Sequence, residues 1–491
     1  MQLLVVSGLA AGADLIAAEE AVDLGLAVLG CLPMPQAEYE RDFAAEELER
    51  FRRVLPRCTD IIVVGTAERR EQGYIDVGNF IAYYAQVLVA FWDGLPARGP
   101  GGTAHVVELR RRGLPSVVGD ELVAYMPDVG PVIQIVTPRA HQPAPADCFA
   151  EKTIHPEGSG DFERAITHIE RFDRDLSESP PSSKRNRLAA LADRADAAAN
   201  RLQAHTLRSL RSVYVAAALA GAAQLVLPAD GSFGIPSWAG IAARIGFLAI
   251  AFAVFAFAKR GDFENRYQDY RAIAEALRVQ YAWWCAGLRT RLVEASYLQM
   301  QQSELAWIRS ALRTAYLVTG SATAKPDSSS SDPECSRWIE GQIDYYERAG
   351  ELEAAHMAQA QRAMRVTAIG GAVISAAAGL AAWAISHHWI NSPVASGASM
   401  VRVLTYWAAM PVAVGSLLAL LIRFYVQQRA FAENARRYQL MFTVFDAARR
   451  RLREGIDDPR RILEQLGHEA LSEHAEWLIL HRDRPLTFVH T

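Results

Sequence analysis

The chain of 491 residues lacks the features that identify several classes of protein. It has five cysteines, an odd number with no CxxC pair, which argues against a disulfide framework or a structural zinc site and indicates a reducing compartment. Its net charge of -4 gives no basic footprint for nucleic acid, so we expect no nucleic-acid partner. Hydrophobic residues at 51% and charged residues at 22% are ordinary values for a globular protein.

The N-terminus also lacks the basic segment that opens a signal peptide. Leu3–Ala13 is apolar, but it runs into Asp14, Glu19 and Glu20 with the periodicity of a helix. We therefore expect no signal peptide and interpret this stretch as the start of a folded domain.

Long uncharged runs are present and organise the second half of the chain. Val366–Ile385 and Val403–Ile422 are each long enough, at about 1.5 Å per residue, to cross most of a hydrocarbon layer of roughly 30 Å. An earlier pair, Val213–Leu227 and Ile245–Ala258, resembles them. We predict two membrane hairpins, with spans at about 213–228, 238–258, 366–386 and 402–422. For the first pair alone, a buried hairpin of a soluble protein is the alternative, since core helices reach this length.

An internal repeat links the two hairpins. Tyr270 and Tyr438 stand 168 residues apart, and the tryptophans Trp307 and Trp477 stand 170 apart. Such a constant register predicts two helical domains, 184–320 and 335–491, each with one hairpin. The low-complexity segment 321–334 is a flexible linker between them.

Short apolar runs alternate with amphipathic segments in the N-terminal part, which predicts a mostly parallel sheet with helices on both faces. Linker 177–183, which contains Pro180–Pro181, separates this domain, 1–176, from the helical part. The stretch 137–161 is interpreted as a loop. The expected strands are Leu3–Val6, Ala27–Leu32, Ile61–Val64, Val87–Phe91, Ser116–Val118 and Ile133–Val136.

Two glycine-containing turns follow strands of this predicted sheet, at the edge where ligands bind. Gly8 and Gly12 in the first turn allow close approach to an anion at a helix N-terminus. The second turn, Gly99–Thr103, can form a backbone nest. Either turn alone can be a plain connection, but the two together favour a nucleotide-like ligand. The candidate ligand residues are Ser7, Gly8, Gly12, Asp14, Asp93, Gly99, Gly101, Gly102 and Thr103.

Other polar residues of this domain fit two interpretations. Glu38, Tyr39 and Asp42 follow the second strand and either contact a ligand or cap the next helix. The run Arg110–Arg112 is typical of a solvated helix end.

Three segments of the N-terminal domain together resemble the SLOG superfamily of Rossmann-like domains: Gly8–Gly25, Cys31–Phe43 and Val87–Gly113. This family includes DNA-processing and lysine-decarboxylase-like proteins and the sensor domain of melastatin-type TRP channels. The resemblance implies that the domain binds a nucleotide or a nucleotide-derived molecule. Some members cleave the base from a nucleoside monophosphate.

The chain departs from this family in two places. Relatives begin with an extra strand that ends in a Gly-His-Arg turn, so part of the ligand pocket is expected upstream or is missing. His105 occupies the position where the family places a glutamate, and Glu108 lies one helical turn further on. These two residues are weak candidates for a catalytic acid or base, so we assign no catalytic residue.

The repeated helical unit resembles the two-transmembrane SLATT effector domains that accompany SLOG proteins in bacterial conflict systems. The C-terminal copy, which ends in Leu466–Pro485, is the closer match. Basic residues flank the spans on the side away from the hairpin tips, which by the positive-inside rule places both termini in the cytoplasm of a multi-pass inner-membrane protein. These residues are Arg208, Arg211, Lys259, Arg260, Arg362, Arg365, Arg423 and Arg429.

Together these features predict a homo-oligomeric membrane effector of bacterial defence. It would sense a nucleotide-derived signal and then assemble in, or permeabilise, the lipid bilayer. A membrane-anchored enzyme that hydrolyses a nucleotide or its N-glycosidic bond is the first alternative, and a ligand-gated channel is the second. We expect no metal and no cofactor other than the nucleotide-derived ligand.

Overall fold

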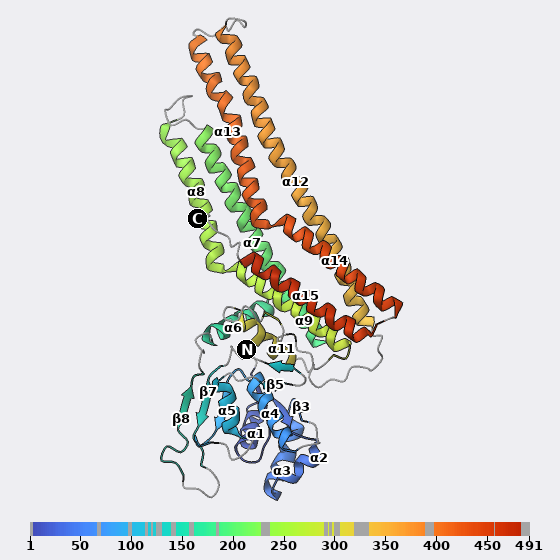
Figure 1. Ribbon diagram of the computed structural model, residues 1–491. Helices are drawn as coiled ribbons and strands as arrows, with labels where there is room; N and C mark the ends of the chain where they lie inside the picture. The colour runs from blue at the N-terminus through green and yellow to red at the C-terminus, as the bar shows by residue number, and fades with distance from the viewer. Residues whose placement is uncertain are drawn as a thin grey trace. The chain divides into compact units, whose positions relative to one another are not determined.

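The computed structural model in Figure 1 describes most of the chain. The described residues are 3–65, 70–96, 101–112, 116–118, 121–123, 130–138, 144–156, 162–182, 186–226, 236–288, 293, 297–298, 305–318, 333–387, 397–455 and 457–482.

A parallel sheet opens the chain, as its sequence predicts. It holds β1 (Leu4–Ser7), β2 (Ala27–Leu32) and β3 (Asp60–Val63) in that spatial order. Leu4 of β1 lies opposite Ala27 of β2, and Leu29 of β2 lies opposite Asp60 of β3. The middle strand is the most buried, because it has a neighbour on either side.

Alternation along β2 divides the core into two layers, because successive strand residues point to opposite faces. Val28 and Leu32 pack with α1 (Ala13–Asp23) and α3 (Ala45–Val54). The intervening residues, Leu29 and Cys31, pack instead with residues of α4 (Arg70–Tyr84). Helices therefore cover both faces of this sheet. Short helical turns complete the segment: α2 (Gln36–Tyr39), η1 (Glu40–Asp42) and η2 (Leu55–Arg57).

The later strands form separate sheets. β4 (Leu88–Phe91) pairs in parallel with β7 (Val132–Ile135), and β8 (Glu151–Ile154) is antiparallel to β7. β5 (Ser116–Val118) and β6 (Glu121–Val123) form a small antiparallel hairpin. The prediction that 137–161 is a loop is therefore wrong for β8. Three of its four side chains are exposed, so it carries no apolar run that would predict a strand.

Helices make up nearly all of the remaining described chain. α5 (Thr103–Arg112) and α6 (Phe162–Ser177) complete the N-terminal part. The others are α7 (Arg187–Val226), α8 (Ser237–Gly261), α9 (Phe263–Cys285), α11 (Ala306–Val318), α12 (Pro333–Ser386), α13 (Gly397–Arg429), α14 (Phe431–Glu454) and α15 (Pro459–Arg482).

A one-residue break recurs in the helical part. Asp262 separates α8 from α9 with φ 50°, and Ala430 separates α13 from α14 with φ 51°. The two residues stand 168 positions apart, which is the spacing of the sequence repeat. Left-handed backbone is unusual for residues other than glycine, so its recurrence at matching positions shows the same turn in both copies.

Packing divides the chain into two compact units that are each discontinuous in sequence. The first contains Met1–Ala198, Asp269–Ser336 and Asp457–Ala475. The second contains Ala199–Gln268, Arg337–Ile456 and Glu476–Thr491. The expected domains were continuous segments. Four of the described helices, α7, α9, α12 and α15, contribute residues to both units, so no linker composition marks the division.

In the described part of the chain, three helical stretches are long and apolar enough to cross a membrane: Trp238–Cys285, Ser336–Ser386 and Ala408–Glu454. Only 11%, 11% and 6% of their most apolar windows are buried within the chain, so most of this apolar surface has no protein cover. This indicates membrane association. The predicted spans at 238–258, 366–386 and 402–422 fall on or overlap these stretches. The span predicted at 213–228 lies on α7, which is not among the three and is described only to Val226.

Candidate ligand-binding site

A cavity of about 1150 Å³ lies in the first compact unit, between β1 and β4. Consecutive residues of both segments line it, 3–8 on one side and 86–91 on the other. Neighbouring strand residues point to opposite faces, so consecutive residues line a cavity only where the edge of the strand faces it. Among the described strands, β1 pairs only with β2, and β4 pairs only with β7. The cavity therefore occupies the space between two open strand edges.

Most of the cavity wall is apolar. α1 and α4 contribute Ala17 and Val77, and α6, α9 and α11 contribute Ile169, Ile273 and Ala311. Such a wall suits a flat or apolar part of a ligand, while a few polar groups would fix its orientation.

The polar end of the cavity lies where β1 and β4 end. Five of the nine residues predicted to bind a ligand line it, three from the first turn and two from the second. These residues are Ser7, Gly8, Asp14, Gly101 and Thr103. The fold thus brings together two turns that stand about ninety residues apart in the chain.

The other predicted residues do not line this cavity. Gly12 has φ 95°, and no atom lies within 4 Å of a Cβ added to it. The glycine is therefore needed for the backbone turn into α1, and no close contact with another group requires it. Asp93 accepts a hydrogen bond from the Leu95 amide at 3.0 Å and so shapes its own turn. Gly102 is exposed at the start of α5. Gly99 lies outside the described residues.

Asp14 is the one carboxylate among the predicted residues that lines the cavity. Protein atoms surround it, and this desolvation raises its pKa. Its side chain nevertheless has exposed surface, because it forms part of the cavity wall. One carboxylate oxygen lies 3.9 Å from the position that a Cβ on Gly8 would take. Asp14 is therefore exposed on the cavity wall, where a ligand can reach it.

Hydrogen bonds hold the first turn in place. The Ser7 hydroxyl accepts from the Leu9 amide at 3.1 Å, and the Tyr39 hydroxyl donates to the Gly8 carbonyl at 3.1 Å. Leu9 is fully buried and has φ 50°, an uncommon conformation for leucine. Tyr39 lines the cavity and does not cap the helix that was expected near Ala44, since Ala44 itself is the N-cap of α3 and no side chain caps that helix. Its pKa is raised by burial.

Gly101 is required by the second turn for two reasons. Its φ is 79°, and a Cβ there would lie 2.9 Å from the Ile75 amide nitrogen and from the Tyr74 carbonyl carbon. The glycine therefore allows the turn after β4 to pack against the start of α4. This close packing puts Tyr74 and Gly78, which the sequence did not single out, in the cavity wall.

The candidate acid and base residues lie elsewhere. Neither His105 nor Glu108 lines the cavity. Glu108 accepts from Arg111 at 3.0 Å and also pairs with Arg112, and its pKa is lowered by the hydrogen bond from Arg111. No group of three or more His, Cys, Asp and Glu side chains in the described part of the chain is arranged to hold a metal ion.

The burial of Arg110 contradicts the prediction that Arg110–Arg112 is a solvated helix end. Its side chain is buried and donates to the carbonyls of Ala82, Gln86 and Gly130 at 3.1, 3.0 and 3.3 Å. Burial, with the nearby Arg313, lowers its pKa to about 9. Arg110 therefore ties α5 to α4 and to the segment before β7.

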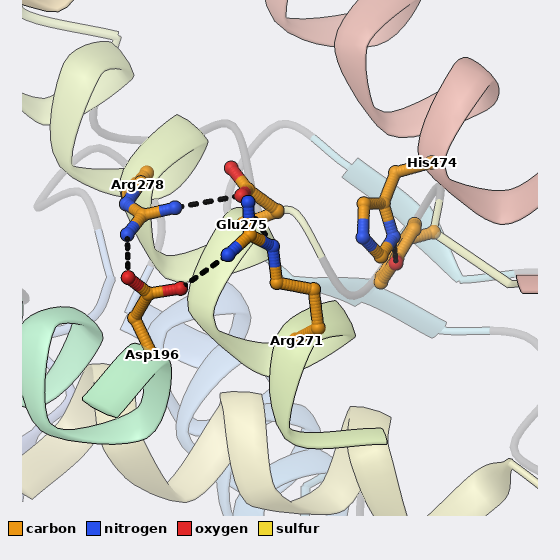
Figure 2. A network of polar contacts seen from close by, with 6 residues as sticks. Asp196, Arg271, Glu275, Arg278 and His474 are labelled. Atoms are coloured by element: carbon orange, nitrogen blue, oxygen red, sulfur yellow. Dashed lines mark hydrogen bonds and ion pairs between the residues drawn. The ribbon is translucent and has the colours of Figure 1, made fainter. Parts of the chain in front are cut away.

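A charged network in the first unit was also not anticipated (Figure 2). Asp196 of α7 pairs with Arg271 at 2.6 Å and with Arg278 at 3.0 Å, both from α9. Glu275 pairs with Arg278 at 2.6 Å and with Arg271 at 3.1 Å. Nearby, His474 Nδ1 lies 2.9 Å from the Tyr297 hydroxyl. The spacing of 271, 275 and 278 along one helix face was the signal that could have predicted this cluster.

Comparison with known proteins gives no match to any family model, to any curated protein or to any solved structure. The functional argument therefore depends on the geometry of the chain itself.

Proposed function

We propose that this chain is a membrane effector whose SLOG-like, Rossmann-like domain senses a nucleotide-derived ligand and whose SLATT-type hairpins respond in the inner membrane of a bacterium. The response would be assembly into a homo-oligomer that permeabilises the bilayer, as part of defence. One observation carries the proposal. The ends of β1 and β4 and both glycine turns meet at the polar end of one cavity, in a chain whose longest apolar helices are mostly uncovered.

The cavity supports the sensing half. Its volume of about 1150 Å³ exceeds the roughly 300–1,000 Å³ of small-molecule pockets, so there is room for a nucleotide. Among its polar lining residues, Ser7 ends β1 and Thr103 begins the helix after β4, at the carboxyl ends of parallel strands, where α/β domains bind ligands. His105 and Glu108 lie outside it, which favours binding over hydrolysis.

Close packing between α12 and α13 supports the membrane half. A Cβ on Gly371 would lie 2.5 Å from the Pro411 carbonyl oxygen, and one on Gly415 would lie 2.3 Å from the Thr367 carbonyl oxygen. Ser375 accepts a hydrogen bond from the Val412 amide at 3.1 Å. Small residues that let backbones approach this closely are typical of helices packed within a bilayer.

A ligand can change the membrane part only if it binds two states of the chain with different affinity. The helices α7, α9, α12 and α15 supply residues to both compact units, so they are the covalent route for such coupling. The network of Asp196, Arg271 and Arg278 joins two of these helices within the first unit.

The test uses full-length protein in vesicles of bacterial phospholipid loaded with a self-quenched dye. Adenosine, guanosine, cytidine and uridine mono- and diphosphates are added in turn, and binding and dye release are measured. Wild type should bind at least one of them and release dye. Gly101→Asp should lose both, because Gly101 has no room for a side chain. Gly246→Ala should retain both, since nothing lies within 4 Å of its Cβ position.

Three outcomes contradict the proposal. The first is the absence of binding by every nucleotide. The second is dye release that persists in a folded Gly101→Asp variant after binding is lost. The third is recovery of the protein in the aqueous fraction after cell breakage and ultracentrifugation. A steady single-channel conductance in place of dye release would identify a ligand-gated channel.

A further inference from the structure

Asp14 presents an unused hydrogen-bonding capacity to the cavity. Within the described part of the chain, its carboxylate makes no hydrogen bond and no ion pair, although Gly8 is in van der Waals range. The only contact of Asp14 with the Ser7 hydroxyl is through its backbone carbonyl, at 3.4 Å. The carboxylate is exposed on the cavity wall, so a ligand with well-placed donors would gain charge-assisted hydrogen bonds to it.

The charges around the cavity select the chemistry of that ligand group. Among the described residues, the charged ones that line the cavity are Asp14, Asp173 and Arg194, and Arg194 already donates to the Leu176 carbonyl at 2.7 Å. A phosphate at the first turn would lie beside the Asp14 carboxylate and be repelled by it. The turn after β1 is therefore poorly suited to the anion that its glycines predicted.

The nucleoside mono- and diphosphates of the proposed ligand class offer no cationic group to Asp14. The residue lies in the first turn of α1, where the N-terminal N–H groups and the helix dipole already favour a negative charge and oppose a positive one. Neutral O–H donors fit best. Two hydroxyls on neighbouring carbons can each donate to one oxygen of a single carboxylate, and hydrogen bonds to an ionised acceptor are the stronger kind.

We propose that Asp14 binds the vicinal hydroxyl groups of a sugar in the ligand, so that the sugar, and not a phosphate, occupies the end of β1. This inference rests on the proposed function, because it assumes that the cavity takes a nucleotide-derived molecule. It makes Asp14 the residue that distinguishes ribose from sugars without the diol.

The experiment measures binding to full-length protein in detergent by calorimetry. The probes are a ribonucleoside monophosphate from the panel that binds, and the matching 2′,3′-dideoxynucleotide, which lacks both hydroxyls. Wild type should bind the ribonucleotide at least tenfold more tightly. Asp14→Asn should lose most of that preference and leave dideoxynucleotide binding unchanged or tighter. Asp23→Asn is the matched control, since Asp23 lies on the same helix, pairs with Arg57 and does not line the cavity.

A second measurement guards against misfolding. Because Asp14 has no partner in the described chain, Asp14→Asn without ligand should melt at a temperature equal to or above that of wild type at neutral pH. The inference is overturned if wild type binds both nucleotides equally, or if Asp14→Asn keeps the preference for the ribonucleotide. It is also overturned if Asp14→Asn melts well below wild type, which would give the carboxylate a structural role. If no nucleotide binds wild type, the proposed function fails first, and the two failures are thereby distinguished.

Discussion

Apolar residues have opposite surroundings in the two halves of this protein. In the N-terminal sheet, Cys31 and Leu32 of β2 are 0% and 1% exposed, because helices cover both faces. In the long helices, Phe252 of α8 and Ile369 of α12 are 60% and 61% exposed. The same kinds of side chain are therefore stabilised by burial within the chain in one half and require a non-aqueous surrounding in the other.

The sharpest way to break this comparison is to truncate one large side chain in each region. Phe51 is fully buried against Tyr39 and Phe43. Phe51→Ala should reduce stability by about 3–5 kcal/mol, because it leaves a cavity in the core. Ile369→Ala should change stability by less than about 1 kcal/mol in a membrane, because Ile369 has little protein cover. Native-state hydrogen exchange of α3 and α12 in the full-length protein measures both, and a large loss at Ile369 would contradict the membrane assignment.

A second prediction concerns the charged network of the first unit. Asp196→Asn should destabilise the protein by about 3 kcal/mol, because Arg271 and Arg278 would lose a partner in a largely enclosed site. A double-mutant cycle with Arg271→Met, followed by chemical denaturation, measures the coupling. Additive effects of the two substitutions would show that the pair does not stabilise the fold.

Two adjacent glycines provide the third test, within the membrane helices. Gly371→Ala should lower the free energy of unfolding by about 1–3 kcal/mol, because its added carbon would meet the backbone of α13. Gly370→Ala should be neutral or slightly stabilising, since nothing lies within 4 Å of that position. Resistance to unfolding in sodium dodecyl sulfate compares them, and equal effects would refute the close packing of α12 on α13.

The fourth prediction concerns how protein stability depends on pH, which follows from the titration of Asp14. Its pKa is raised in the folded state, so its contribution to stability is present below the unfolded pKa and is lost as pH rises through the folded one. Wild type should therefore gain less stability than Asp14→Asn between acidic and neutral pH. Melting temperatures of the two proteins across this range test the sign, and parallel curves would contradict it.

The smallest effect is expected at an exposed ion pair. Arg53 pairs with Glu19 at 2.7 Å on the surface of the α1 and α3 layer, and the Arg53 side chain is 59% exposed. Arg53→Gln should change the free energy of unfolding by less than about 1 kcal/mol, because water and salt screen the pair. A loss as large as that of Asp196→Asn would erase the distinction between enclosed and exposed charge in this fold.

Sequence patterns predicted the elements that depend on neighbouring residues. The short apolar run Ala27–Leu32 and the long uncharged run Val366–Ile385 identified a strand and a long helix without knowledge of any contact. The interval of 168 residues between Asp262 and Ala430 is likewise a property of the chain. The strand β8 was not predicted. It has four residues and no buried face, so its sequence carries no periodic pattern of apolar residues.

The sequence by itself determined the long helices, the parallel strands β1, β2 and β3 and where apolar surface is concentrated, because these features follow from residue order and short-range geometry. Only the tertiary structure decided that Asp14 faces a cavity, that Arg110 is buried and that Asp196 meets Arg271. Burial and charge pairing depend on groups far apart in the chain, so their positions are fixed only when those segments pack together.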